Sequence, residues 1–232
     1  MTLTYALVAD SGIVLAADSQ VTDYHKIGED AGPMRVVGAY KSKTSKIRQL
    51  KNGSAFSIAG NAGIVDSLLA TADAELDDSG PFEDVVRAHE NLFRDEYEKA
   101  YGKDNYPVRC AFLFCGFTKH HYPQIIQLDS STGFTWNPVA TTKGYGFTGR
   151  ENHGGVLYLH RRLFVREMKL DAAKCLAYCV LSEVADLDEV VGPPIEMAVI
   201  TESGVAPITD FSRYERKRQQ VIGAAQSIIH SE

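Results

Sequence analysis

The sequence predicts an α+β fold, a four-layer αββα sandwich in which two antiparallel sheets pack face to face and a pair of helices flanks each sheet. Three observations predict it. Segments follow the order strands, two helices, strands, two helices, strands. Short turn sequences join neighbouring strands, as they do in hairpins. Both kinds of segment carry apolar faces, and a layered arrangement would bury all of them.

The chain begins with a predicted hairpin. Residues 3–9 and 13–18 are rich in strand-forming residues, and the turn sequence Asp10-Ser11-Gly12 lies between them. A long polar excursion, residues 20–45, follows, with a short extended piece expected at 36–37. This excursion separates the first hairpin from the next strands.

A second hairpin and a helix pair complete the first half. Strands are expected at 47–50 and 54–59, around the turn sequence Lys51-Asn52-Gly53. Apolar residues then recur at helical spacing over 64–72 and over 82–93, on either side of a Gly-Pro break. His89 belongs to the second apolar stripe and is therefore expected to be a packing residue.

The second half repeats this pattern. Strands are expected at about 109–116, 123–128 and 136–141, and helices at about 154–168 and 171–186. The chain shows no repeat, no low-complexity segment and no linker, so residues 1–232 are expected to form one domain. Its last elements are predicted to be two strands and a polar C-terminal helix, at about 195–201, 205–208 and 211–230.

Composition excludes several classes of function. The chain has 232 residues, of which 44% are hydrophobic, and a formal net charge of -6, which disfavours a nucleic-acid partner. The basic run 216–218 is expected to be a solvated helix face. No apolar stretch approaches the roughly 20 residues of a membrane span, and the N-terminus lacks a basic leader. We therefore expect a cytoplasmic protein with no membrane partner.

The four cysteines do not form a recognisable metal or disulfide pattern. Cys175 and Cys179 are one helical turn apart, but no nearby His or carboxylate completes a ligand set. All four are expected to be buried reduced thiols, Cys110 and Cys115 included. His120 and His121 are expected to be exposed, and no metal or cofactor is predicted.

Thr2 is the first candidate for chemistry. A free threonine hydroxyl is a poor nucleophile and needs a nearby base to accept its proton. If Met1 is removed, the α-amino group of Thr2 becomes that base, because its unperturbed pKa of about 7.7–8.0 is close to neutral. If Thr2 is considered alone, its position is also explained by a frayed strand end with no chemical role.

Three further positions carry a resemblance to a known family. Asp18 lies in Ala-Ala-Asp-Ser-Gln, Lys46 opens Lys-Ile-Arg-Gln-Leu, and Gly60 lies in Ser-Ile-Ala-Gly-Asn. At these points the sequence resembles the catalytic β subunits of the proteasome and the related bacterial ring and Anbu-type peptidases, which are N-terminal-nucleophile hydrolases. The resemblance is good over the first 75 residues and weaker beyond them.

The resemblance implies a role for each of these residues. Thr2 would be the nucleophile and, through its amine, the proton acceptor. Lys46 would lower the pKa of the Thr2 hydroxyl, and Asp18 would hold the lysine in place. The Gly60 N–H would stabilise the oxyanion. An ordinary ion pair for Lys46 and Asp18, and a simple turn at Gly60, remain alternatives.

The chain departs from the family at two serines. The family has a Gly-Ser-Gly turn near the nucleophile's amine, where this chain has Tyr145 between two glycines. The second acidic position of the family corresponds to Asp188, and Val191 stands where the family has a serine. Asp186 is another candidate for this position. An equal alternative is that Asp188 is only a solvated loop carboxylate. The secondary hydroxyls of the site are therefore missing.

The implied activity is that of a threonine peptidase acting on a peptide or unfolded protein through an acyl-enzyme on Thr2. Its pocket would lie near Val21, Thr44, Ile58 and Ala62, which favour a modest apolar side chain. A transpeptidase or protein ligase using the same acyl-enzyme, and an inactive ring or scaffold subunit, are alternatives. The resemblance also implies a homo-oligomer, a ring or a helical stack; an ATPase unfoldase partner is left open.

Overall fold

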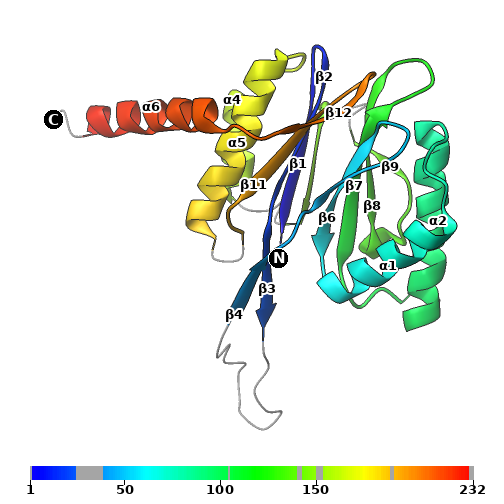
Figure 1. The fold of residues 1–232 in the computed structure, drawn as a ribbon. Coiled ribbons are helices and arrows are strands. Elements are labelled where there is room, and N and C mark those ends of the chain that lie inside the picture. The colour runs from blue at the N-terminus through cyan, green and yellow to red at the C-terminus, as the bar shows by residue number, and fades with distance from the viewer. Residues whose placement is uncertain are drawn as a thin grey trace, which may run out of the picture.

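The chain folds into two stacked sheets with helices on both outer faces (Figure 1). The computed structural model describes residues 2–24, 39–103, 105–139, 143–149, 154–188 and 191–229, and within them all side chains except those of residues 21–24, 39–43, 154–157 and 221–229. Among the described helices, none is long and apolar enough to cross a membrane.

The first sheet contains the N-terminal hairpin in its middle. Its strand order is β10-β1-β2-β11-β12, and every neighbouring pair is antiparallel. The strands are β1 Leu3–Ala9, β2 Gly12–Asp18, β10 Tyr145–Gly149, β11 Ile195–Thr201 and β12 Gly204–Ile208. In this register Leu3 lies opposite Gly149, and Asp18 lies opposite Ile195. The two ends of the chain's first hairpin are thus next to residues from the second half.

The second sheet has the strand order β5-β6-β7-β8-β9 and is also antiparallel. The strands are β5 Ile47–Gln49, β6 Ala55–Gly60, β7 Cys110–Phe117, β8 Pro123–Asp129 and β9 Asn137–Pro138, with a 3-10 turn, Ser130–Thr132, after β8. A separate two-stranded ribbon pairs β3 (Gln20–Tyr24) with β4 (Ala39–Lys43). The extended piece expected at 36–37 lies outside the described residues.

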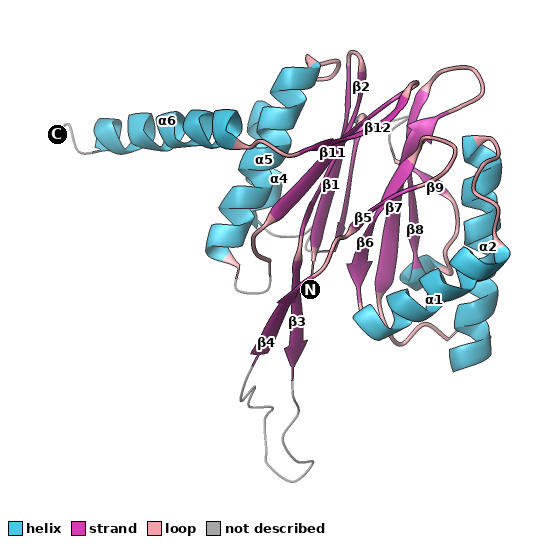
Figure 2. Ribbon diagram, viewed as in Figure 1, coloured by secondary structure: helices cyan, strands magenta, loops and turns pink. Residues whose placement is uncertain are grey.

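Helices form the outer layers of the sandwich (Figures 1 and 2). The helices are α1 Ala62–Glu75, α2 Phe82–Tyr101, α4 Gly154–Leu163, α5 Leu170–Leu187 and α6 Ser212–Ile229. The pair α1 and α2 covers the second sheet, and α4 and α5 cover the first. The last helix, α6, begins beside α5 and extends away from the sandwich (Figure 1).

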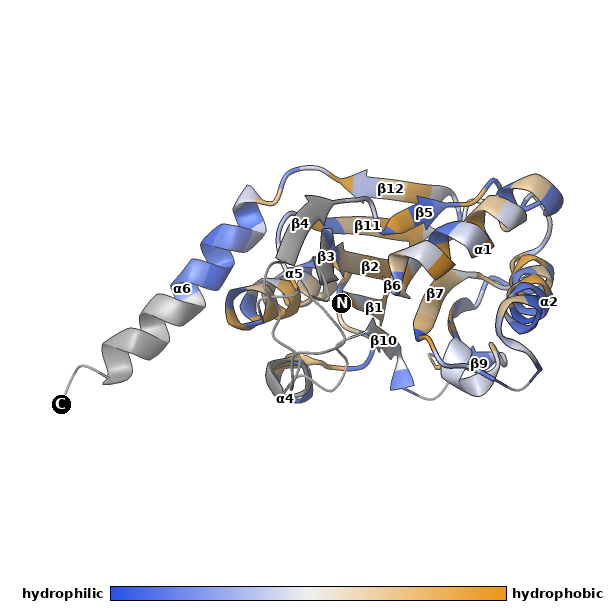
Figure 3. Ribbon diagram, turned by 90° about the horizontal axis from the view of Figure 1, so that it is seen from below, coloured by the Kyte–Doolittle hydropathy of each residue, from blue (hydrophilic) through white to orange (hydrophobic). Residues whose placement is uncertain are grey.

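Three apolar clusters hold the layers together. One lies between the two sheets and includes Leu15, Leu113 and Ile125. The others lie between each sheet and its helices, with Val180 of α5 against the first sheet and Phe93 of α2 against the second. Apolar strands accordingly occupy the middle of the molecule, while α2 and the start of α6 turn polar residues outward (Figure 3). The predicted four-layer sandwich is confirmed.

The structure differs from the sequence prediction in several elements, among them the ribbon of β3 and β4, which lies where a polar excursion was expected. Of the strand expected at 136–141, the described residues 136–139 form only the two-residue strand β9, and α4 ends at Leu163 instead of 168. Glu167 has a φ of 61°, which is incompatible with a continuing helix. Strand β10 was not predicted, because its glycines are depleted in strands and typical of turns. A Cβ at Gly146 would nevertheless crowd the space between the sheets, since it would lie 2.9 Å from the Val139 side chain and 3.0 Å from the Leu113 side chain.

An aromatic cluster joins α4 to the first sheet. His160 is buried, and its Nδ1 lies 2.6 Å from the Tyr5 hydroxyl. The His160 ring also contacts the rings of Tyr145, Phe147 and Phe164, with the Tyr145 centroid at 3.8 Å. Burial, together with the smaller effect of the nearby Arg161 charge, lowers the pKa of His160 to about 4. The histidine is therefore a neutral core residue.

Acid is expected to destabilise the fold through His160. Its folded pKa is below the ordinary value of about 6.5, so the unfolded state binds more protons between these values. Stability should therefore fall as pH drops from about 6.5 towards 4. Urea unfolding at several pH values gives the free energy of unfolding as a function of pH. Its slope should be shallower in His160→Gln than in the wild type, and the substitution of an exposed histidine, His120→Gln, is the control. An unchanged slope in His160→Gln would contradict the assignment.

Candidate active site

Thr2 and Lys46 meet where the two sheets come together at one end of the sandwich. Thr2 immediately precedes β1, and Lys46 immediately precedes β5 of the other sheet. The Lys46 Nζ donates a hydrogen bond of 2.7 Å to Thr2 Oγ1. Both residues are buried, with 5% and 4% of their surface exposed. The stacking of the sheets thus places an ammonium group directly on the threonine hydroxyl.

Asp18, at the end of β2, receives hydrogen bonds at both carboxylate oxygens. Its Oδ2 accepts from Lys46 Nζ at 3.1 Å, and its Oδ1 accepts from the Leu3 N–H at 2.9 Å. Two further backbone N–H groups donate to Oδ2, those of Gln20 at 3.2 Å and Gly192 at 3.3 Å. The fully buried carboxylate is therefore held by four donors from four parts of the chain. This arrangement fixes the position of Lys46.

Burial favours the neutral forms of Lys46 and Asp18, whereas the contacts that the two side chains make favour their charged forms. Burial lowers the pKa of Lys46, while the Asp18 carboxylate raises it. Burial likewise raises the pKa of Asp18, against the Lys46 charge and the N–H groups of Leu3 and Gly192. Because the pKa of Lys46 is lowered, it releases a proton more readily than an exposed lysine does. Such a group can exchange a proton with the hydroxyl that it contacts.

Glu196 of β11 holds the backbone that carries Lys46. Its Oε2 accepts hydrogen bonds from the Lys46 N–H at 3.0 Å and from Ser45 Oγ at 3.1 Å. Its charge also raises the pKa of Lys46. The sequence analysis did not identify this residue as part of the site. The available signal was an acidic residue within the otherwise apolar stretch 195–201.

Glu196→Gln is expected to slow acylation of Thr2 by about tenfold, because a hydrogen bond to a charged group contributes roughly 1.5–3 kcal/mol and glutamine keeps part of it. Loss of the negative charge should also lower the pKa of Lys46 further. The rate of modification of Thr2 by a threonine-directed electrophile, measured against pH, reads out both effects. Glu202→Gln, an exposed site in the β11–β12 turn, should change neither.

Two glycines that line the same cleft as Thr2 stand in positions where a side chain has no room. Gly149 of β10 has a φ of 88°, and a Cβ there would lie 1.8 Å from the Thr2 carbonyl oxygen. Gly60, at the end of β6, has a φ of 120°, and its Cβ would lie 2.4 Å from the Arg109 carbonyl oxygen. The second contact gives Gly60 a steric requirement that is independent of any chemistry. Only Gly149 makes its close approach to Thr2 itself, whereas Gly60 makes its close approach to the residues that begin β7.

A cleft of about 760 Å³ extends from Thr2 along α1. Thr44, Ile58 and Ala62, three of the four predicted pocket residues, line it; the side chain of the fourth, Val21, lies outside the described residues. Apolar side chains of α1 add to the lining, namely Val65 and Leu69.

The cleft also carries charged residues that the sequence analysis missed. Arg48 and Asp73 both line the cleft and form a two-pronged ion pair, with N–O distances of 3.2 and 3.0 Å. Asp66 of α1 and Arg109 line it as well. The cleft therefore combines apolar side chains with charges of both signs.

The predicted secondary acids are not among the described residues that line this cleft. Asp186 pairs with Arg218 of α6. Asp188 follows α5, and its carbonyl accepts from the Val191 N–H at 3.1 Å. Neither acid, nor Val191, lines the cleft. This segment contacts the site through the Gly192 N–H, which donates to Asp18.

Tyr145 does not lie beside Thr2, which corrects the alignment with the family serine. In β10 it pairs with Leu7, and its ring belongs to the aromatic cluster around His160. The β10 residue next to Thr2 is Gly149, four positions further along. Because this segment is rich in glycine, it can be aligned with the family's Gly-Ser-Gly turn in several registers. Only the pairing of β10 with β1 shows which residue lies next to Thr2. The Tyr145 hydroxyl therefore does not replace the serine hydroxyl of the family.

Among the described residues, no group of three or more His, Cys, Asp or Glu side chains is arranged to hold a metal ion. The polar groups around Thr2 are an ammonium, a carboxylate and backbone N–H groups, and each of them has a partner in the chain. This set suits the activation of a hydroxyl by charge and hydrogen bonding.

Comparison with known proteins identifies the family. No curated protein matches the sequence. Three solved structures share the fold: Anbu (ancestral beta-subunit) from Yersinia bercovieri (TM-score 0.75, 15% identity, covering 99% of this chain and 97% of that one); an Anbu (Gly-1) mutant from Hyphomicrobium sp. strain MC1 (0.75, 14%, 100% and 98%); and the helical assembly of the Anbu complex from Pseudomonas aeruginosa (0.78, 15%, 99% and 96%). The family model for the proteasome subunit matches residues 2–200. The chain therefore belongs to the proteasome subunit family.

Proposed function

We propose that the chain is a threonine peptidase that hydrolyses peptide bonds through an acyl-enzyme on Thr2. The observation that carries the proposal is the 2.7 Å hydrogen bond from Lys46 Nζ to Thr2 Oγ1. A buried cation at this distance favours the alkoxide form of the hydroxyl. Asp18, itself held by three backbone N–H groups, keeps the cation in place.

The proton acceptor in this proposal is the α-amino group of Thr2, which becomes available when Met1 is removed. The amine takes the Oγ proton as Oγ attacks the peptide carbonyl, and it then passes the proton to the leaving amine. A water molecule next attacks the ester, and Thr2 is restored. Gly60 is proposed to donate its N–H to the oxyanion.

The substrate is proposed to lie in the cleft along α1. Ile58, Ala62 and Leu69 offer an apolar surface next to Thr2, which suits a modest apolar side chain. The ion pair of Arg48 and Asp73 lies further along the lining and offers polar contacts to an extended peptide.

Intact-mass analysis tests the proposal. Protein recovered from its native cell is exposed to a peptide epoxyketone, an electrophile directed at N-terminal threonine. We expect loss of Met1 and one adduct on Thr2, and no adduct in Thr2→Ala. Retained Met1 without an adduct would sink the proposal. An amine-bearing acceptor peptide, added to the active enzyme, separates hydrolysis from transpeptidation by the product formed.

We also infer a cytoplasmic homo-oligomer, either a ring or a helical stack. The Pseudomonas aeruginosa relative is described as a helical assembly. In this chain, large apolar side chains are exposed on the layer formed by α4 and α5, among them Tyr158, Leu163, Val165 and Leu187. Burial of such side chains favours association. Sedimentation velocity should show species larger than the 25.5 kDa monomer.

A further inference from the structure

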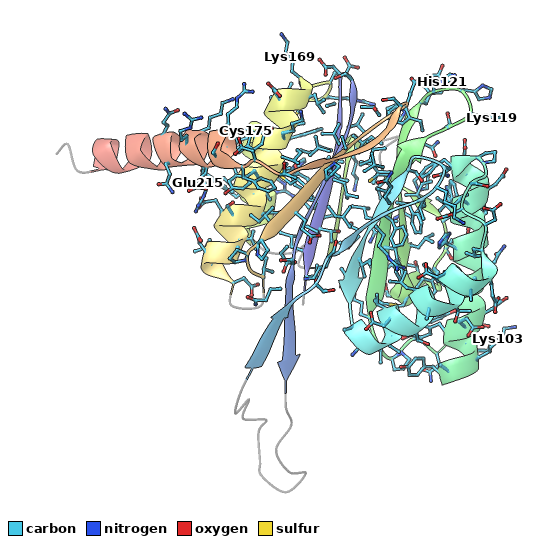
Figure 4. The ribbon with its side chains drawn as sticks, viewed as in Figure 1. Lys103, Lys119, His121, Lys169, Cys175 and Glu215 are labelled. Carbon is cyan, nitrogen blue, oxygen red and sulfur yellow. The ribbon has the colours of Figure 1, made fainter. Side chains whose placement is uncertain are left out.

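Chemically active side chains also gather outside the cleft. One such place is on α5, where Cys175 and Cys179 are half-buried, whereas Cys110 and Cys115 of β7 are fully buried. The expectation that all four thiols are buried is thus wrong for the α5 pair, of which Cys175 lies close to where α6 meets α5 (Figure 4). Another is a pocket of about 200 Å³ between α1, α2 and the second sheet, which we call the side pocket.

The side pocket adjoins the cleft. Arg48, Leu69 and Asp73 line both of them. The walls of the side pocket combine charged side chains with apolar ones, among them Phe56 of β6 and Leu76 at the end of α1. Its volume is below the roughly 300–1,000 Å³ of pockets that hold drug-sized ligands, so it suits a small molecule or a single side chain.

His89 of α2 gives the side pocket a hydrogen-bond acceptor. The residue is 3% exposed, and its ring packs edge-on against Phe93 and Phe114, as expected of a packing residue. Its Nδ1 lies 2.9 Å from the Val85 carbonyl oxygen, which can only accept, so Nδ1 carries the proton. Burial lowers the pKa of His89, and the ring is therefore neutral near neutral pH. Its Nε2 is then an acceptor, to which no described residue donates.

Asp78, in the loop between α1 and α2, gives the side pocket a second acceptor. Its Oδ1 is buried and accepts no hydrogen bond from a described residue; Lys51 Nζ, its ion-pair partner, lies 3.4 Å away. The Lys51 side chain is 71% exposed, so solvent weakens its effect on the carboxylate. Asp78 and His89 both line the side pocket, and the charge of Asp78 acts on the pKa of His89. Two acceptors therefore face one small pocket.

The pairing of the charged side chains indicates which ligand these acceptors suit. The side pocket is lined by two acids and two basic residues, so its net charge is close to zero. Asp73 accepts hydrogen bonds from Arg48 at both oxygens, at 3.2 and 3.0 Å. Among the described side chains, Asp78 has only the contact with Lys51, which also lies 4.0 Å from Asp77. The unused hydrogen-bonding capacity thus belongs to acceptors, and an ammonium group, with three N–H donors and no acceptor, is complementary to them.

We propose that the side pocket binds a primary alkylammonium ion, either a free amine or the side chain of a lysine. The ammonium group donates hydrogen bonds to Asp78 Oδ1 and His89 Nε2. Its methylene groups lie against the apolar side chains of Phe56, Leu69 and Leu76. This binding does not involve Thr2 and is therefore independent of the proposed peptidase activity.

Isothermal titration calorimetry with n-butylammonium tests the binding. A dissociation constant on the order of 1 mM is expected, because so small a ligand makes few contacts. Butyltrimethylammonium keeps the charge and the chain but has no N–H group, so it should bind at least about tenfold more weakly. Thr2→Ala should bind n-butylammonium as the wild type does, which makes the result independent of the chemistry at Thr2. Equal affinity for the two ions, or no saturable binding of n-butylammonium, would overturn the proposal.

Matched variants test which carboxylate holds the ion. Asp78→Asn should weaken binding by about tenfold or more, because it removes the charged acceptor. Lys51→Met should strengthen binding, because it removes the cation that competes for Asp78. Asp66→Asn is the control, since Asp66 is a carboxylate of α1 that lines the cleft and not the side pocket. Thermal unfolding shows whether each variant is folded. Equal weakening in Asp66→Asn and Asp78→Asn would mean that the cleft holds the ion, contrary to the proposal.

Nitrogen-15 spectra of the histidine side chains test the location. The Nε2 resonance of His89, assigned from its loss in His89→Gln, should shift during the titration as this nitrogen accepts a hydrogen bond. His160, and His121 in the β7–β8 turn (Figure 4), do not line the side pocket, and their resonances should not shift. An unchanged His89 resonance at saturation would overturn the proposal.

Competition separates the two sources of the ion. Displacement of n-butylammonium by Nα-acetyl-lysine methylamide would assign the side pocket to the lysine side chain of a polypeptide, and lack of displacement would assign it to a free amine. Nα-acetyl-norleucine methylamide has a similar chain without the ammonium group and should not displace the probe. Displacement by the norleucine compound would show that the side pocket recognises the apolar chain alone, and the proposal would be wrong.

Discussion

Thr2→Ala is expected to reduce acylation and peptide hydrolysis by at least about a thousandfold, as the loss of a covalent nucleophile does in other hydrolases. The substitution removes Oγ and leaves Lys46 with its remaining partners, the Asp18 carboxylate and the Gln20 carbonyl. The fold should therefore persist. Alanine also allows removal of Met1, so processing is unchanged. Peptide turnover and epoxyketone labelling measure the effect.

Two control variants make this result specific. Thr2→Ser keeps a hydroxyl at hydrogen-bond distance from Lys46 and should retain most of the acylation. Thr4→Ala removes a buried hydroxyl two residues along, which bonds to Thr148 at 2.9 Å; it should lower stability while leaving acylation in place. Substantial hydrolysis by Thr2→Ala would mean that the nucleophile lies elsewhere.

Removal of the Lys46 charge is expected to have the second largest effect. In Lys46→Met the Thr2 hydroxyl loses its cation and Asp18 loses its counter-charge. Breaking a buried ion pair from one side costs about 3–5 kcal/mol of stability. Acylation should fall by about a hundredfold or more, since loss of a single preorganised electrostatic contact has that effect. Urea unfolding and labelling kinetics measure the two losses separately.

A double-mutant cycle measures the coupling between Asp18 and Lys46 separately from the contribution of each residue. Asp18→Asn combined with Lys46→Met removes both charges, so the double variant should be more stable than the sum of the single losses predicts. It should remain inactive, because the cation is absent. The exposed Lys51→Met should change stability by less than about 0.5 kcal/mol. Additive losses in the cycle would contradict the coupling inferred from the 3.1 Å contact.

The pH dependence of Lys46→Met should differ from that of the wild type. Without the lysine charge, burial raises the pKa of Asp18 more strongly, because Lys46 opposes that rise in the intact pair. The folded state then holds a proton that the unfolded state releases at about pH 3.9, so stability is lost as pH increases above this value. If stability plotted against pH ran parallel in Lys46→Met and the wild type, the pKa of Asp18 would not depend on Lys46.

Local sequence patterns were sufficient to predict most of the fold. The turn at residues 10–12 and the helical spacing in α1 and α2 are local signals, and they correspond to the elements found. Strand β10 has no such signal. Its glycines are required by tertiary contacts, Gly146 against Leu113 and Gly149 against the Thr2 carbonyl. These contacts exist only after the sheets have formed.

The same distinction applies to the site. Thr2 and Lys46 could be grouped because their positions match a family pattern, and the structure brings them into contact. Glu196 and the Gly192 N–H contribute through the pairing of β11 with β2, a contact between residues about 175 positions apart. Spacing along the sequence cannot indicate such a partner. Tyr145 was misplaced for the same reason, because the register of β10 depends on β1.

The four donors to Asp18 have a consequence for the order in which the protein folds. They come from the N-terminus, the end of the first hairpin, the start of β5 and the segment before β11. The Gly192 donor is 174 positions from Asp18, and contacts between residues so far apart in the sequence form late, after the local hairpins and helices. The set of hydrogen bonds that holds Asp18, and through it Lys46, is therefore complete only once β11 has docked on the first sheet. If Thr2 is the nucleophile, as we propose, a nascent or partly folded chain would lack the complete arrangement that activates it.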